Sequence, residues 1–131
     1  MALRLGTFRI GDAPKRGEGL RLATTRFLPR GVKKADYKRL RLFDLWFPVL
    51  APSRTLLKTR NKSGFMKRYE AELRRSTDAR QAVFLVAEVA KRTAVSVGCY
   101  CADEAQCHRT VLARIIRTAA EGRWPGSGAP V

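Results

Sequence analysis

Strand-like and helix-like segments alternate along this chain, and the alternation limits the folds that it can adopt. Short apolar or alternating runs predict strands over residues 3–10, 20–25, 40–47 and 93–97. Helical periodicity predicts helices over residues 54–60, capped by Ser53, over residues 64–75, after Ser76 or Thr77, and over residues 110–121. We therefore expect an α/β fold with a mostly parallel, Rossmann-like sheet and helices on both faces.

The chain length of 131 residues fits a single domain with a core of its own. We expect this domain to span residues 1–122, because glycine and proline residues then predict a flexible tail over residues 123–131. No apolar run is long enough to span a bilayer, and no signal-peptide pattern is present. We expect a cytoplasmic protein without a membrane partner, whose oligomeric state stays open.

The third predicted helix carries its apolar residues on a broad arc. We expect this arc to face the sheet and Phe84 alone to point away from it; the arc contains Ala82, Leu85, Val86, Val89 and Ala90.

Positive charge is the strongest signal in the composition. The formal net charge is +16, and residues 1–62 hold sixteen basic side chains against only four acidic ones. A basic surface attracts polyanions, and contacts to phosphate dominate nucleic-acid affinity. The charge predicts a phosphorylated small molecule or a nucleic acid as partner, with solubility and an arginine-rich composition as the alternative explanation.

All three cysteines and the single histidine lie within residues 99–108. This segment falls between a predicted strand and a predicted helix. In parallel sheets, ligands bind at the carboxyl ends of strands, where helix N-termini favour anions. The segment is therefore our candidate site.

The basic side chains near strand ends are candidate phosphate ligands. We expect the anion to be bound by Arg26, Arg30, Lys34, Arg109 and Cys101. Arg30 lies between Pro29 and Gly31, and an arginine held in such a turn suits a bidentate contact to phosphate. The alternative is a solvated basic loop.

Nucleophilic catalysis would use Cys107 or Cys101, with His108 or Glu104 as the base. Two helix registers are open. If the helix begins at Glu104, His108 faces the apolar side of the helix and is a hydrogen-bonded core residue. If the helix begins near Cys107, the dipole at the N-terminus lowers the pKa of that thiol and favours an anion.

The sequence contains none of the common phosphate-loop, serine-hydrolase, zincin or dinucleotide motifs, which disfavours those enzyme classes.

The cysteines allow two further interpretations. Zinc could be bound by Cys99, Cys101, Cys107 and His108, but one residue separates the first pair, whereas structural zinc sites usually separate ligands by two to four. We therefore predict no metal cofactor. Three cysteines so close in sequence are a poor disulfide framework for a secreted domain, so we expect reduced thiols. The alternative is a redox switch, formed by a Cys99–Cys107 or a Cys101–Cys107 disulfide.

Four motifs in order resemble an uncharacterised family, domain of unknown function 488, over about residues 19–120. The motifs are Pro29-Arg30-Gly31-Val32-x-Lys34; Asp44-x-Trp46 with Leu50-Ala51-Pro52-Ser53; Phe65-x-x-x-Tyr69-x-x-Glu72-Leu73; and Cys99-x-Cys101-x-x-Glu104-x-x-Cys107-His108-Arg109. The resemblance implies a small single-domain α/β protein and marks a site without a reaction. The chain departs from the family at residues 58–65, which lack a Trp-Phe pair and are more basic.

Two functions follow from the sequence. The first is binding of a phosphorylated or nucleotide-like anion at the turn that carries residues 99–109, with or without catalysis. The second is a nucleic-acid-binding module that stacks bases on Tyr37, Trp46 and Tyr100, in which the cysteine cluster is structural or redox-sensing.

Overall fold

A four-stranded parallel sheet forms the centre of the computed structural model, which describes residues 3–101 and 107–125. The strands are β1 (Leu5–Arg9), β2 (Leu20–Ala23), β3 (Leu45–Trp46) and β4 (Val95–Cys99). Their order across the sheet is β1-β4-β2-β3, and each neighbouring pair is parallel. The predicted single-domain α/β fold with a parallel sheet is confirmed.

Four α-helices and two short 3-10 turns complete the described part of the chain. These elements are η1 (Lys34–Asp36), η2 (Pro48–Leu50), α1 (Arg54–Leu57), α2 (Phe65–Arg75), α3 (Thr77–Arg92) and α4 (His108–Ala120). Serine side chains start two of the helices: Ser53 accepts a hydrogen bond from the Leu56 amide, and Ser76 accepts one from the Ala79 amide. The predicted cap at Ser53 is confirmed, and Ser76 is the cap of α3.

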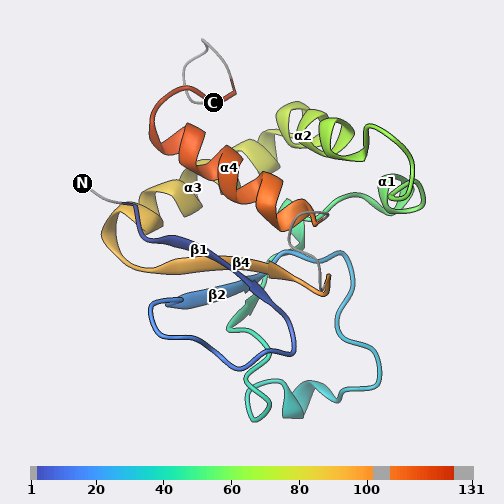
Figure 1. Cartoon of the computed structure of the whole chain (residues 1–131), viewed down its shortest axis with the longest axis vertical. Helices are drawn as coiled ribbons and strands as arrows, with labels where there is room; N and C mark the ends of the chain where they lie inside the picture. Colours follow the sequence, from blue (N-terminus) through green and yellow to red (C-terminus); the bar gives the residue numbers. More distant parts are fainter. Residues whose placement is uncertain (1–2, 102–106, 126–131) are drawn as a thin grey trace.

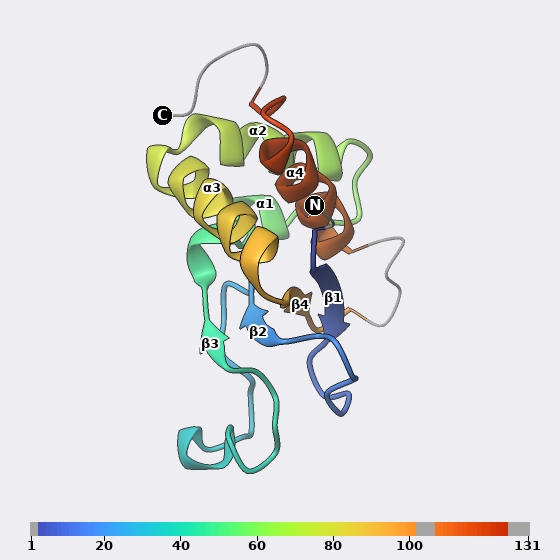
Figure 2. The same ribbon diagram turned by 90° about the vertical axis from the view of Figure 1, so that its left-hand side faces the viewer.

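One face of the sheet, which we call the helix face, packs against α3 and α4, and α2 packs on these two helices (Figures 1 and 2). Val95 and Val97 point from β4 into this core, where Leu112 and Ile115 of α4 are fully buried. No described helix is long and apolar enough to cross a membrane.

Helix α3 is rotated relative to our expectation. Leu85 is 60% exposed, whereas Val83 and Ala87 are buried with Val86. Phe84, which we expected to point away, packs on Trp124 with ring centroids 6.0 Å apart. Trp124 is buried in the same core and is the aromatic partner of Phe84.

The opposite face of the sheet, which we call the loop face, is covered differently from our expectation. Within residues 3–101 and 107–125 the α-helices pack on the helix face only, so the prediction of helices on both faces is wrong (Figure 2). A small apolar cluster of Phe8, Ile10 and Ala23 lies here, against Leu42 and Phe43 from the loop before β3. The predicted strand over residues 40–47 is therefore reduced to Leu45–Trp46, because the residues before it pack over the sheet instead of pairing in it.

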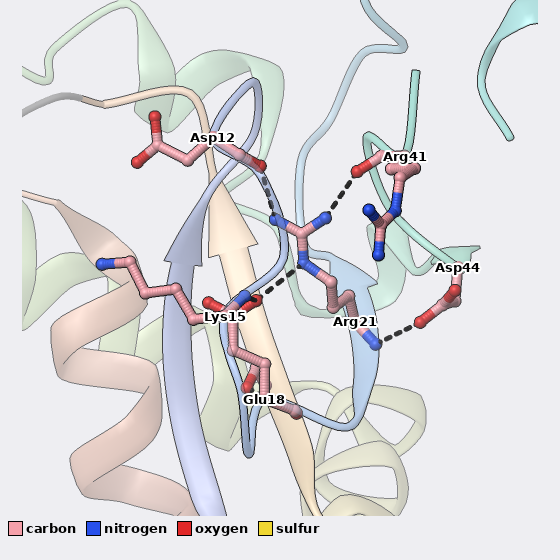
Figure 3. Close-up of polar contacts among 7 residues, drawn as sticks. Asp12, Lys15, Glu18, Arg21, Arg41 and Asp44 are labelled. Carbon is pink, nitrogen blue, oxygen red and sulfur yellow. Dashed lines mark hydrogen bonds and ion pairs between the residues drawn. The ribbon is translucent and has the colours of Figure 1, made fainter. Parts of the chain in front are cut away.

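A buried arginine holds the loops on this face (Figure 3). Arg21 of β2 is 3% exposed and lies over the Phe8 ring, 4.2 Å from its centroid. Its guanidinium donates to the Arg41 carbonyl (2.6 Å) and to the Asp12 carbonyl (3.1 Å), and its Nε lies 3.1 Å from a Glu18 carboxylate oxygen. The Arg21 side chain thus joins two loops to the sheet, the one between β1 and β2 and the one between β2 and β3.

Candidate functional site

A cavity of about 550 Å³ opens at the carboxyl ends of the central strands. Its size is within the range of small-molecule sites. Segments that follow β2 and β4 line it together with α1, the loop after α1 and the start of α4; the lining residues are Thr25, Arg26, Phe27, Pro52, Leu57, Arg60, Asn61, Phe65, Cys99, Tyr100, Cys101 and His108. The location agrees with the strand-to-helix turn identified in the sequence.

The cavity combines exposed aromatic rings with arginines. Phe27 is 44% exposed and Tyr100 is 40% exposed, and the Tyr100 hydroxyl donates to the Phe27 carbonyl at 3.0 Å. Arg26 donates from Nε to the Pro52 carbonyl and from Nη2 to the Ala51 carbonyl, both at 3.1 Å. A guanidinium has five N–H donors, so these two bonds orient Arg26 and leave donors for a ligand.

The predicted anion ligands separate into three groups. Arg26 and Cys101 line the cavity. Arg30 and Lys34 are exposed in the segment between β2 and β3 and do not line it. Arg109 is 4% exposed and donates from Nη1 to the Cys101 carbonyl (2.6 Å) and to the Cys99 sulfur (3.2 Å). The structure therefore does not bring the five predicted ligands together in one site.

His108 is a buried residue with a defined tautomer. Its Nε2 lies 2.8 Å from the Thr24 carbonyl, which can only accept, so Nε2 carries the proton and Nδ1 keeps a lone pair. Burial lowers the pKa of His108 to about 4; the Arg109 charge also lowers it, and the hydrogen bond to Thr24 opposes the shift. The Tyr69 ring packs edge-on against the imidazole of His108, with the two ring centroids 5.3 Å apart. These contacts are those of the core histidine that was one of our two alternatives.

The helix register, by contrast, is the later of the two alternatives. Helix α4 begins at His108, and Cys107 is its N-cap residue. Glu104, the other candidate base, lies outside the described residues.

The three cysteines lie together although they come from different elements. Cys99 ends β4, Cys101 follows it, and Cys107 precedes α4. Their sulfur atoms all lie within 4.8 Å of one another. Cys99 and Cys107 form a disulfide, so the expectation of reduced thiols is wrong for this pair, and the bond is one of the two that we considered as a redox switch. Cys101 is free and exposed. In this state Cys101 is the thiol that a ligand in the cavity can reach, and Cys107 is not available as a nucleophile.

Sequence reasoning missed the contribution of the loop after α1. Arg60 and Asn61 line the cavity from this loop, and both are exposed. The signal was present in the sequence, since residues 58–65 are unusually basic compared with the pattern that the chain resembles.

Several motif residues hold backbone groups around the cavity. The Trp46 indole donates to the Thr25 carbonyl at 2.9 Å, and the Tyr69 hydroxyl donates to the Leu50 carbonyl at 2.5 Å. The Ser53 hydroxyl donates to Glu72, whose second oxygen accepts from the Ser53 amide at 3.0 Å. The motifs therefore position the rim of the site and also contribute five of the residues that line it, Pro52, Phe65, Cys99, Cys101 and His108.

Fold and site together define a small parallel α/β protein with a cavity at the carboxyl edge of its sheet and a cysteine cluster beside it. A family model described as the active DUF488-N3 subclade (DUF488-N3a) matches residues 5–120, so the chain belongs to the DUF488 family and the expected relationship is confirmed. Searches of curated proteins and of solved structures found no match.

Proposed function

We propose that the cavity binds a small phosphorylated or nucleotide-like anion, with Arg26 and Arg60 at the charged part of the ligand and Phe27 and Tyr100 at its planar part. The observation that carries the proposal is the pairing of two exposed aromatic rings with two arginines around about 550 Å³ at the carboxyl ends of parallel strands. Arginine binds phosphate oxygens in a planar, bidentate geometry, and aromatic rings stack on bases.

Cys101 gives this site a candidate reactive group. Its exposed thiol lines the cavity, whereas Cys99 and Cys107 are buried and bonded to each other. A ligand held by Arg26 and Arg60 would lie beside this sulfur. Any covalent chemistry on the bound ligand is therefore assigned to Cys101 in place of Cys107.

The test measures the thermal unfolding midpoint with nucleoside monophosphates, nucleoside diphosphates and inorganic phosphate. A ligand that binds only the folded state at about a hundred times its Kd should raise the midpoint by roughly 8 °C. Arg60→Gln removes a charge from the cavity rim and should weaken binding about tenfold or more. Arg30→Gln removes the same charge outside the cavity and is the matched control, which should bind like the wild type.

A short DNA duplex in the same assay tests the second function. Nucleic-acid binding is favoured by the net charge of +16 and by Trp46, which is 41% exposed. Stabilisation by the duplex alone, fading steeply with salt and reduced equally by Arg30→Gln and Arg60→Gln, would replace the cavity proposal with this alternative.

A further inference from the structure

We propose that the reduced cysteine cluster is a metal site, in which the thiolates of Cys99, Cys101 and Cys107 bind one thiophilic divalent cation such as Zn²⁺. We further propose that formation of the Cys99–Cys107 disulfide releases the cation. The inference does not rest on anion binding in the cavity. It concerns a different set of atoms, and the structure as described holds the disulfide of the oxidised cluster.

The first support is the geometry of the three sulfur atoms. They lie within 4.8 Å of one another, and ligands of a tetrahedral zinc ion, with Zn–S bonds of about 2.3 Å, have sulfurs about 3.8 Å apart. The Cα atoms of Cys99 and Cys107 are 7.6 Å apart, wider than the range of about 4.4 to 6.8 Å that is usual for disulfides. This backbone spacing leaves room for an ion between the two thiolates.

The second support is the charge balance around Arg109. This side chain is 4% exposed, and among the residues that the structure describes no carboxylate forms an ion pair with it. Its Nη1 instead donates to the Cys99 sulfur at 3.2 Å, and its Nε is buried without a partner in the described part of the chain. A buried cation is stabilised by a negative charge close to it.

A thiolate metal centre would supply that counter-charge. Three thiolates and one divalent cation carry a net charge of −1, which the guanidinium of Arg109 balances. A guanidinium that donates a hydrogen bond to a metal-binding sulfur also orients that sulfur and tunes the properties of the metal. Arg109 would thus be a positioning residue for the metal centre.

The third support is the open side of the cluster. Cys99 and Cys107 are buried, but Cys101 is exposed and lines the cavity. His108 is not part of this group: its Nδ1 lies 4.0 Å from the Cys107 sulfur, but only the three sulfur atoms all lie within 4.8 Å of one another. The fourth position would therefore face the cavity and be taken by water or a ligand, which is the arrangement of catalytic rather than structural zinc sites.

Release follows from the chemistry of the two buried thiolates. With hydrogen peroxide as oxidant, Cys99 and Cys107 each give up one electron and form an S–S bond, while the O–O bond breaks and two protons complete two water molecules. Cys101 then remains as the single thiolate ligand, which is too few to retain the cation.

The test begins with metal uptake by the fully reduced whole chain under anaerobic conditions. We expect one Co²⁺ per chain, seen by thiolate-to-cobalt charge-transfer absorption, and displacement of Co²⁺ by Zn²⁺. Cys101→Ser changes an exposed side chain, so it should fold normally and bind more than about tenfold more weakly. Leu85→Ala alters an exposed side chain on α3 without removing a thiol, and it should bind like the wild type.

Oxidation of the zinc-loaded protein provides the second measurement. Hydrogen peroxide should release one Zn²⁺ per chain to a chromophoric chelator as the Cys99–Cys107 disulfide appears in the peptide map. No uptake by the reduced protein, unchanged affinity in Cys101→Ser, or zinc that stays bound after disulfide formation would each overturn the proposal. The anion proposal depends on Arg60→Gln, outside the cluster, so either proposal can fail without the other.

Discussion

The two faces of the sheet are stabilised in different ways. On the helix face, apolar side chains from α2, α3 and α4 form one continuous core with Val95 and Val97. On the loop face, a few apolar residues surround Phe8, and the covering loops are held by the hydrogen bonds and the ion pair of Arg21 (Figure 3). Loops bring backbone carbonyls that need partners, so a face covered by loops requires a polar anchor that a helix-covered face does not.

This difference predicts different tolerance to substitution. Apolar packing accepts another side chain of similar volume, because it has no required direction. Arg21 must reach two carbonyls and one carboxylate from a fixed position, which only a planar guanidinium does.

The largest effect should come from the helix face. Leu112→Ala creates a cavity at a fully buried position and should lower the free energy of unfolding by about 4 kcal/mol in urea denaturation. Leu112→Met keeps the volume and should lower it by less than about 1.5 kcal/mol. Leu85→Ala, at a residue that is 60% exposed on the same layer, is the control and should change it by about 0.5 kcal/mol or less.

The loop face should respond to loss of its anchor by a smaller amount. Arg21→Met leaves the Glu18 carboxylate and two carbonyls without their partner, and we expect a loss of about 3 kcal/mol in the same assay. Arg21→Lys keeps the charge but loses the planar set of N–H donors. It should therefore also lower the free energy of unfolding, in contrast to the small change expected for Leu112→Met. Full stability in Arg21→Lys would show that charge alone anchors the loops and would remove the contrast between the faces.

Lowering the pH should distinguish the two faces most selectively, because the histidine that responds to it lies on the helix face. The unfolded chain protonates His108 near pH 6.5, whereas the folded protein does so only near pH 4, so stability is complete above pH 6.5 and falls as the pH is lowered. The loss should reach about 3 kcal/mol at pH 4, seen as a falling urea midpoint. His108 faces the Tyr69 ring, the Cys107 sulfur and the Arg109 charge on the helix side.

His108→Gln should be less stable at pH 7 and should lose this pH dependence, whereas Arg21→Met should retain it. Equal slopes between pH 6.5 and 4 in wild type and His108→Gln would mean that another group controls the acid response.

Most of the fold was predictable from the sequence, and the errors in that prediction have local causes. Periodicity identified α2, α3 and α4 because their apolar stripes contact the sheet or each other. It failed at residues 40–47, where Leu42 and Phe43 are apolar because they cover the loop face and not because they pair in a strand. Alternation of apolar and polar residues reports burial, and burial alone does not distinguish these cases.

The site was predictable in position but not in composition. The cysteine cluster was identified because its residue types are rare in this chain. The buried roles of Arg21 and Arg109 were not predictable, because their hydrogen-bond acceptors are backbone carbonyls, and a carbonyl has no sequence signature. Arg60 differs from Arg30 only in which loop carries it, so charge alone could not separate the residue on the cavity rim from the one outside it.

The position of β4 has a consequence for how this protein folds during its synthesis on the ribosome. Strands β1 and β2 do not pair with each other; each pairs with β4, which is the last of the four described strands along the chain. Residues 10–94 must therefore emerge before β1 has a neighbour in the described sheet, and of the earlier strands only β2 and β3 can pair during that interval. A single late strand therefore joins β1 to the β2–β3 pair, and the four-stranded sheet forms only after β4 has been synthesised.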